Sequence, residues 1–425
     1  MVDWLILIAA ACACAMHGTP IRWSSLPVIL IATVTARAVG GVRPAGKVTL
    51  LMRLVPATVL ASAAWLAAVA IVRLDQQDGI ALLGGMGALT CGFWLGRASS
   101  GSDVQVNRFF SSLAIGYSAH AVILLSWFIQ SAGWSVPDLV RLRWDPAHFD
   151  ESAGFGFGNL GNNAVVAAML VPMFLTSALG AASTAQRAIG AAALFLGLGV
   201  LGILQARAAI FATTVTAVVL LAALRSWRTL ALLAACTLLT ELAFNTIAAQ
   251  FEDNAVRRII DALAAPNDDA SFRERVDSIA EGWKISLEHP WAGIGGSKIP
   301  LTMTHSAPHQ WHLHQALEWG MPVAIAAAFS TIAVFASFFR SVWLTLNIGK
   351  PWDQVMICLS IPATYLMVGS IAGAQWHYGM ASVWPALSGL GFGMAWAVQR
   401  ERRTSIAPID PLKSRHPRRI RRSPC

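Results

Sequence analysis

Apolar segments long enough to cross a membrane recur from one end of the 425-residue chain to the other. A transmembrane helix needs about 20 consecutive apolar residues, because lipid offers no hydrogen-bond partner to an exposed backbone. Hydrophobic residues make up 56% of the chain and charged residues only 12%, and the mean hydropathy is +0.58. The sequence therefore predicts an all-α polytopic membrane protein and excludes an ordinary soluble globular protein.

The hydropathy pattern predicts about twelve transmembrane helices. We expect them near residues 2–16, 24–37, 54–73, 79–96, 109–133, 163–182, 188–204, 209–224, 229–249, 321–339, 354–373 and 380–398. The first run resembles the core of a signal peptide. No basic residue precedes it, so we interpret it as a membrane helix.

Basic residues set the expected orientation, since Lys and Arg are enriched in short cytoplasmic connections. If both termini are cytoplasmic, so are the connections that carry Arg37, Arg53, Arg97, Arg187, Arg225 and Arg340. The long connections 134–162 and 250–320 then lie outside. We predict a single transmembrane domain over residues 1–400, including the outer loop 250–320, and a basic, disordered cytoplasmic tail over residues 401–425.

The net charge of +9 does not indicate nucleic acid. The C-terminal basic cluster follows the last apolar run directly, a position typical of contact with anionic lipid headgroups. The six cysteines show no paired spacing of a metal site or a disulfide framework, so we interpret them as small packing residues.

The outer loop 250–320 carries three motifs in a distinctive order. Arg275 comes first, within Ser-Phe-Arg-Glu-Arg-Val. Pro290 follows fifteen residues later and opens Pro-Trp-Ala-Gly-Ile-Gly-Gly. The third motif runs from Pro308 to Gly320 as Pro-His-Gln-Trp-His-Leu-His-Gln-Ala-Leu-Glu-Trp-Gly. Pro308 and His309 suit the first positions of a helix, and Gly320 with Pro322 suits its end.

This order resembles the signature of the O-antigen ligase and O-antigen polymerase superfamily, which is related to bacterial protein O-oligosaccharyltransferases. That signature is an Arg, a Pro followed by Gly-x-Gly, and a His-Asn that opens a helix ending in Glu-x-Gly. Upstream, Gln205-Ala206-Arg207 is similar to the family's Ser-Arg, and Gly161-Asn162-Asn163 to its Asn-bearing entry to a span. Gln310 replaces the usual Asn, and Ala206 replaces Ser.

The resemblance implies a GT-C-like glycosyltransferase in the bacterial inner membrane, with its active site facing the periplasm. It would transfer a glycan from a polyprenyl (undecaprenyl) diphosphate carrier to a lipid A-core acceptor, with no cofactor and no metal. Arginine matches phosphate oxygens bidentately and keeps its charge, so Arg207 and Arg275 are expected to hold the diphosphate. We expect a neutral His309 to act as general base.

Further residues are predicted to bind substrate, and they are Gln310, Asn162, Asn163, Gly293, Gly295, Glu318 and His377. His314 and Glu318 are also expected to form an exposed pair one helical turn apart. Arg273 is expected to be a solvated charge, although a shift of two positions in the motif would exchange it with Arg275.

Four alternatives stay open at this point. A polymerase would use a second lipid-linked glycan as acceptor, and a protein O-oligosaccharyltransferase would use a Ser or Thr. A secondary transporter would show internal repeats and mid-membrane charges, which the sequence lacks. The four histidines between His305 and His314 suggest zinc, but Pro308 separates His305 from the predicted helix.

Overall fold

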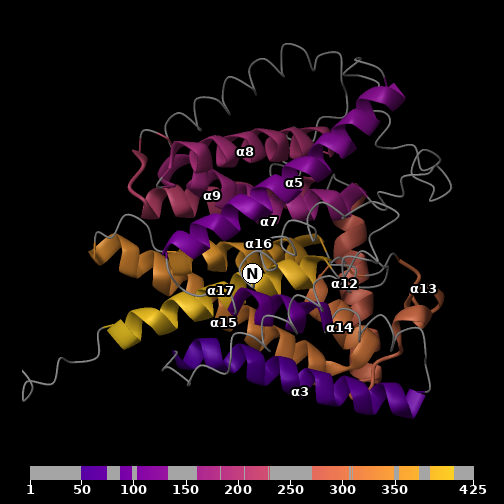
Figure 1. The fold of residues 1–425 in the computed structure, drawn as a ribbon. Coiled ribbons are helices and arrows are strands. Elements are labelled where there is room, and N and C mark those ends of the chain that lie inside the picture. The colour runs from indigo at the N-terminus through magenta and orange to yellow at the C-terminus, as the bar shows by residue number, and fades with distance from the viewer. Residues whose placement is uncertain are drawn as a thin grey trace, which may run out of the picture.

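The protein folds into a bundle of helices (Figure 1). The structure is a computed structural model. It describes residues 49–73, 87–97, 103–132, 160–181, 183–204, 206–227, 229, 270–305, 308, 310–348, 354–372 and 383–405. Within these ranges all regular structure is helical. The elements are α3 (Leu50–Arg73), α5 (Asp103–Ala132), α7 (Leu160–Gly180), α8 (Thr184–Leu204), α9 (Arg207–Ala223), α12 (Ala270–Glu288), η3 (Gly296–Lys298), α13 (Ile299–Thr302), α14 (Trp311–Trp319), α15 (Met321–Ile348), α16 (Gln354–Ala372) and α17 (Val383–Ser405).

Six of the described helices are long and apolar enough to cross a membrane, namely α3, α5, α7, α8, α15 and α16. They confirm six of the predicted spans. The apolar helix α9 has 17 residues and lies at the predicted span 209–224. Residues 87–97 and α17 are helical where two further spans were predicted. The predicted spans 2–16, 24–37 and nearly all of 229–249 lie outside the described residues.

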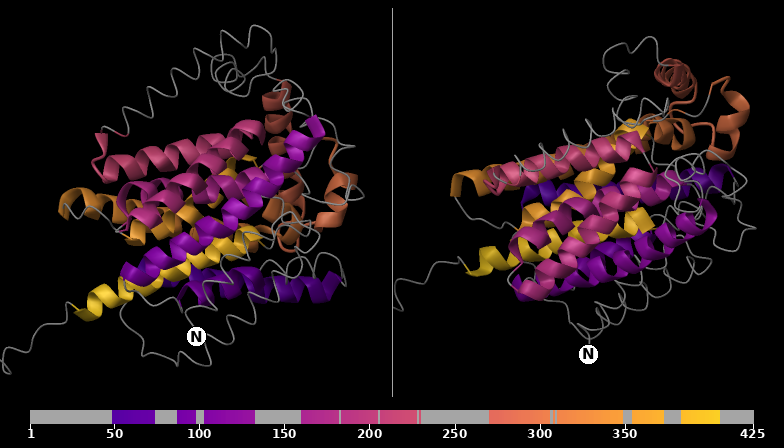
Figure 2. Two further views of the ribbon diagram at one scale, coloured as in Figure 1. Left: turned by 45° about the horizontal axis from the view of Figure 1, so that its top comes forward. Right: turned by 90° about the horizontal axis from the view of Figure 1, so that it is seen from above.

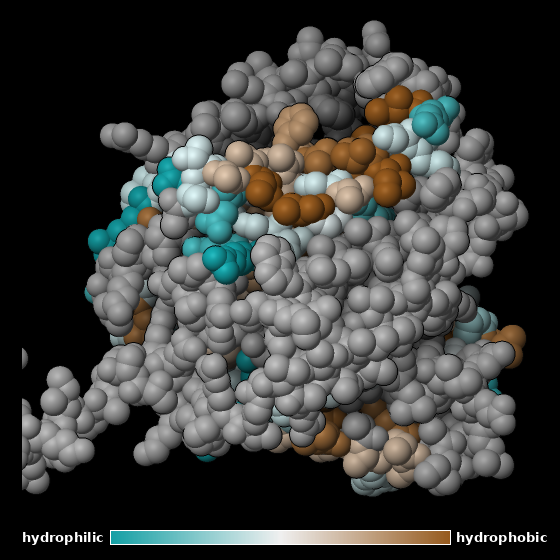
Figure 3. Space-filling view, in the orientation of Figure 1, coloured by the Kyte–Doolittle hydropathy of each residue, from teal (hydrophilic) through white to brown (hydrophobic). Residues whose placement is uncertain are grey.

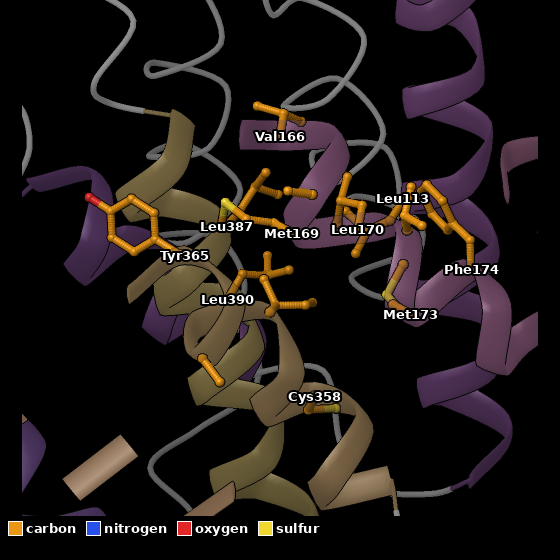
Figure 4. Packing of buried hydrophobic residues seen from close by; sticks show 14 of the residues in the cluster. Leu113, Val166, Met169, Leu170, Met173, Phe174, Cys358, Tyr365, Leu387 and Leu390 are labelled. Atoms are coloured by element: carbon orange, nitrogen blue, oxygen red, sulfur yellow. The ribbon is translucent and has the colours of Figure 1, made fainter. Parts of the chain in front are cut away.

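The core forms where α7 and α16 meet their neighbours. Residues 163–174 of α7 are buried without interruption, and α16 is buried along most of its length. Figure 4 shows Leu113 of α5 beside Phe174, and Met169 beside Leu387 of α17. A helix that is apolar on all sides suits this central position.

The peripheral helices expose large apolar side chains instead. Leu60 of α3 is 70% exposed, Phe195 of α8 is 78% exposed and Ile332 of α15 is 62% exposed. In Figure 3 apolar residues gather over α5 and α8 on one side of the molecule and over α3 on the other. Lipid tails are as apolar as these side chains, so the exposure fits helices that face a bilayer.

The helices α3 and α15 are antiparallel neighbours. The hydroxyls of Thr58 and Ser330 hydrogen-bond at 2.5 Å. The Trp65 Nε1 donates to the Trp319 carbonyl at 3.4 Å. The start of α3 therefore lies at the end of the bundle where α15 finishes. There Thr49 also donates its backbone N–H to the Gln399 Oε1, near the end of α17, at 3.1 Å.

The two ends of the bundle differ in what they carry. Across one end lie α12, η3, α13 and α14, and we call this the motif end (Figures 1 and 2). At the opposite end Arg225, just after α9, donates to the Leu346 carbonyl near the end of α15 at 2.6 Å. We call this the basic end, because it also carries Arg53 in the first turn of α3, Arg97 and Arg340.

The domain boundary predicted at residue 400 falls inside a helix. Helix α17 continues through the basic residues that follow its apolar segment and ends at Ser405. The remainder of the predicted tail, residues 406–425, lies outside the described residues.

Candidate functional site

Helix α12 presents Arg275 and Arg273 to different surroundings. Residues two apart on a helix of about 3.6 residues per turn lie on nearly opposite faces. Arg275 is half-buried and shares a face with the buried residues Ser278, Gly282 and Ile285, whereas Arg273 is exposed. Arg275 therefore faces the rest of the motif end, and Arg273 faces away from it.

Gly282 is the point of close contact between α12 and the third motif. A β-carbon at this position would lie 3.2 Å from Pro308 Cγ, 3.2 Å from Leu317 Cδ1 and 3.3 Å from Leu313 Cδ2. These atoms belong to α14 and to the segment just before it. Without a side chain at residue 282, the helix that carries Arg275 packs directly against the residue that precedes His309.

Glu281 adds a second connection between α12 and this segment, which the sequence did not indicate. Its Oε1 accepts hydrogen bonds from Thr304 N at 2.8 Å and Thr304 Oγ1 at 2.7 Å. Its Oε2 accepts from His305 N at 3.1 Å and lies 3.0 Å from His305 Nδ1. These bonds, the first of them from the Thr304 backbone, lower the pKa of Glu281 to about 2. We call this set of contacts the Glu281 clasp.

Helix α14 begins later than predicted. Its first residue is Trp311, and Gln310 is the N-cap with extended backbone at φ −126° and ψ 114°. The Gln310 Oε1 accepts the N–H of Leu313 at 2.5 Å, as an N-cap side chain does. The prediction that Pro308 and His309 occupy the first helical positions is wrong, because the Gln310 amide provides the cap two residues beyond the proline.

His309 itself lies outside the described residues, but both of its neighbours are described. Pro308 is buried against Gly282 of α12. Gln310 is held by its capping bond to α14. The backbone on each side of His309 is therefore anchored, one side to the Arg275 helix and the other to the start of α14.

A chain of hydrogen bonds connects Gln310 to α15. The Gln310 Nε2 lies 3.0 Å from His312 Nδ1, and the His312 Nε2 lies 3.0 Å from Thr331 Oγ1. Thr331 donates its proton to the Ala327 carbonyl at 2.9 Å, so its oxygen accepts from His312 Nε2–H. The Nδ1 then accepts from the Gln310 amide, which assigns a neutral ring. Burial lowers the pKa of His312, in agreement with that assignment.

The glycine motif forms a turn that is bonded to the end of α14. Ile294 N donates to the Leu317 carbonyl at 2.6 Å, and Gly295 N to the Glu318 carbonyl at 3.2 Å. In return Met321 N donates to the Pro290 carbonyl at 2.7 Å. The predicted tight turn is present, and it gives Gly293 and Gly295 a role in packing against a neighbouring helix.

The backbone requires glycine at Gly293, within this turn, and at Gly320, which ends α14. Gly293 has φ +61° and Gly320 has φ +92°, values that residues with a β-carbon rarely adopt. A β-carbon on Gly293 would overlap the Leu317 carbonyl oxygen, and one on Gly320 would overlap the Trp291 carbonyl oxygen. The second and third motifs therefore fold together as one unit. Gly320 also ends α14 as predicted.

His314 and Glu318 are buried, so the prediction of an exposed pair is wrong. Their exposed fractions are 5% and 3%, and the His314 Nε2 lies 3.8 Å from the Glu318 Oε2. The spacing of the two residues was sufficient to predict that they meet. Their burial depends on α15 and α16, which pack around α14.

Beside α14 lies a mostly apolar cavity of about 320 Å³. Its polar lining near the motif end comes from Gln315 and Glu318 on α14, between Trp311 and Trp319. The remaining wall is formed mainly by apolar side chains of α3, residues 87–97, α15, α16 and α17, with Ser62, Thr90, Ser330 and Ser388 among them. The cavity thus extends from α14 into the interior of the bundle.

Arg207 is the first residue of α9 and is half-buried. Because α9 finishes at the basic end, where Arg225 meets Leu346, Arg207 lies toward the motif end. Ala206 is the N-cap of α9 and makes no side-chain capping bond. Replacement of the family's Ser by Ala206 therefore removes a preferred helix cap beside this arginine.

Of the other predicted site residues, the two asparagines belong to a described helix and His377 does not. Asn163, in the first turn of α7, is fully buried. Asn162 belongs to the same helical turn, and nothing is described of its side chain. The connection that carries His377 lies outside the described residues.

The fold and the motif end together define a multi-pass α-helical membrane protein with a structured loop domain at one end of the spans. Residues 192–328 match the O-antigen ligase family model. This match supports the O-antigen ligase-like superfamily that the motifs predicted. The match covers α9, α12 and α14 and so includes both arginines and all three loop motifs. No curated protein matches the chain.

Proposed function

We propose that this protein is a glycosyltransferase of the O-antigen ligase type. It transfers a glycan from a polyprenyl diphosphate carrier to the sugar of a lipid A-core acceptor. The observation that carries the proposal is the convergence of α12 and the third motif within the matched region. Gly282 and Glu281 pack the helix of Arg275 against the segment that contains His309.

Arg275 and Arg207 are proposed to hold the diphosphate. A guanidinium offers a planar fork of N–H donors that matches phosphate oxygens and stabilises the charge that develops as the diphosphate leaves. Arg275 is half-buried on the packed face of α12, and Arg207 starts α9 at the same end of the bundle. The start of α9 also contributes the positive end of a helix dipole, which favours a phosphate group nearby.

His309 is proposed to be the general base. A neutral imidazole takes the proton of the acceptor hydroxyl as its oxygen attacks the anomeric carbon of the donor glycan. The bond from that carbon to the phosphate oxygen breaks, and the polyprenyl diphosphate leaves with the electron pair. The anchored residues on each side, Pro308 and Gln310, support a fixed position for His309 during this step.

The cavity beside α14 suits the apolar chain of the carrier. It is lined mainly by apolar side chains along the spans, with a few Ser and Thr residues among them, and its amide and carboxyl groups come from α14 at the motif end. A polyprenyl chain placed there would put its diphosphate near α14, where Gln315 and Glu318 lie. Gln310 and the glycine turn would then contribute to substrate binding by shaping the site. Direct contact of Gln310, Gly293 and Gly295 with the substrate stays a prediction.

The charge distribution supports an orientation with the motif end in the periplasm. Arg53, Arg97, Arg225 and Arg340 are at the opposite end, and basic residues concentrate on the cytoplasmic side of membrane proteins. The protein would then be in the bacterial inner membrane, and its active site would meet lipid-linked substrates at the periplasmic surface.

The acceptor is tested by incubating the purified protein, in nanodiscs, with a polyprenyl diphosphate glycan. Lipid A-core, a second lipid-linked glycan and a pilin-like protein are supplied in separate reactions. We expect lipid A-core to be extended and the other two to be unchanged. Extension of the second lipid-linked glycan would identify a polymerase instead, and extension of the protein an O-oligosaccharyltransferase. No extension of any acceptor would contradict glycosyl transfer.

A further inference from the structure

Helix α12 exposes a continuous apolar face that its packing against α14 leaves uncovered. The face consists of Val276, Ile279, Trp283 and Leu287, and we call these four residues the α12 stripe. Their exposed fractions are 49%, 41%, 52% and 57%. Spacings of three and four residues align them on one side of the helix. Monomeric soluble proteins rarely expose such an apolar surface without a partner.

The other faces of α12 already have defined surroundings. Ser278, Gly282 and Ile285 are buried toward α14. The side that remains is charged and exposed, with Asp277, Lys284 and Glu288. The exposed surface of α12 is therefore itself divided into an apolar side and a charged side. The apolar side, the α12 stripe, lies next to the buried face.

The direction of α12 in the molecule indicates what covers the stripe. In Figures 1 and 2 this helix runs across the direction of the spans, at the rim of the motif end. A helix perpendicular to the spans lies parallel to the membrane surface. Amphipathic helices in that orientation bury their apolar face about 5–10 Å into the boundary between headgroups and acyl chains.

Aromatic and basic residues agree with this position. Trp283 is within the stripe, and Trp291 in the turn that follows α12 is 70% exposed. Tryptophan is enriched at the membrane–water interface. Lys284 and Arg273 lie exposed on the charged side of the same helix, where they can meet phosphate groups of the lipids.

We infer that α12 is an interfacial membrane helix whose stripe, Val276, Ile279, Trp283 and Leu287, is inserted into the lipid of the leaflet at the motif end. The partner of this surface is the bilayer itself. If the proposed function also holds, the insertion places Arg275 at the depth of the lipid phosphates. A lipid-linked diphosphate would present its charge at that depth.

Spin labels test the inference on the full chain and without any substrate. Single cysteines are placed at the four stripe positions and, as matched controls on the same helix, at Asp277, Lys284 and Glu288. The background is a variant in which the six native cysteines are replaced by alanine. Each labelled protein is shown to be monodisperse and is reconstituted in phospholipid nanodiscs. Collisions with oxygen, which concentrates in lipid, and with a water-soluble nickel chelate are then measured for every position.

The stripe labels are expected to collide mainly with oxygen and the control labels mainly with nickel, so that the ratio follows the helical period. Stripe labels as accessible to nickel as the controls would overturn the inference, because the face would be in water. Stripe labels shielded from both reagents would also overturn it, because another protein segment or a second copy would then cover the face. Neither result depends on transferase activity, so the proposed function is tested separately.

Discussion

Replacing Glu281 by glutamine should loosen the segment before His309 while leaving α12 in place. The carboxylate accepts hydrogen bonds from Thr304 and His305 through both of its oxygens. Glutamine keeps the size of the side chain but only one acceptor oxygen. Its NH₂ group would meet donors of either Thr304 or His305, so about half of the clasp is lost.

The magnitude follows from the kind of bond and from its exposure. A hydrogen bond to a charged group contributes about 1.5–3 kcal/mol. The Glu281 side chain is 20% exposed, and water competes for its oxygens. We therefore expect local opening to become easier by about 1–2 kcal/mol in total. This corresponds to a factor of about 5–30 in the open population, and so in the exchange rate of the Thr304 and His305 amides.

Hydrogen exchange followed by mass spectrometry of peptides that cover residues 303–305 measures this change. Glu288→Gln is the matched control, because Glu288 is an exposed carboxylate on the same helix. In Glu281→Gln turnover should fall by up to about 100-fold, the effect of a displacement near 1 Å in a catalytic group. The affinity for the donor should be unchanged, because the substitution leaves α12 and Arg275 in place. Equal exchange of the Thr304 and His305 amides in Glu281→Gln and Glu288→Gln would refute the stabilising role of the Glu281 clasp.

The clasp also has a defined dependence on pH. The pKa of Glu281 is lowered from 4.5 to about 2 in the folded protein. The stabilisation is therefore complete above pH 4.5 and is lost as the pH falls from 4.5 toward 2. Protection of residues 304 and 305 should decrease across this window in the wild type. In Glu281→Gln the decrease should be absent.

Three further predictions concern the turn, the orientation and the chemistry. Gly320→Ala should lower the free energy of unfolding by about 1–3 kcal/mol or more, because its φ is +92° and the β-carbon would meet the Trp291 carbonyl. Gly202→Ala, where nothing lies within 4 Å, should be neutral or stabilising in the same melting assay. Thr302→Cys at the motif end should react with an impermeant thiol reagent in intact cells, and Trp227→Cys at the basic end only after permeabilisation. Turnover should survive EDTA, and activity restored only by a divalent ion would reject diphosphate stabilisation by arginine alone.

The spans were the most predictable part of the fold, since hydropathy directly reports the solvent of a helix. Their ends were less predictable. The prediction 321–339 stopped before Arg340, whereas α15 continues through it to Ile348. A helix does not have to end where the hydrocarbon ends, and hydropathy alone cannot locate its last residue.

The loop site was predicted in outline, and its details depended on contacts between distant residues. The motif order indicated that Arg275, the glycine turn and the His309 segment belong together. It could not show the Glu281 clasp, because the partners are 23 and 24 residues away in the chain and a single Glu on a polar helix face looks like a solvated charge. The start of α14 was misplaced because the proline rule competed with the Gln310 cap, which only the backbone conformation at Gln310 reveals.

The division of roles among Arg207, Arg275 and His309 is the central claim, and donor binding measured beside the initial rate tests it most directly. Both quantities are determined in one nanodisc preparation for the alanine variants of these residues, with Arg273→Ala as the control. We expect His309→Ala to lower the rate by about 100- to 10,000-fold with donor affinity unchanged. Arg207→Ala and Arg275→Ala should weaken donor binding as well as turnover, with only partial rescue by lysine, and Arg273→Ala should be mild. A fully active His309→Ala, or arginine variants that bind the donor as tightly as the wild type, would contradict the account.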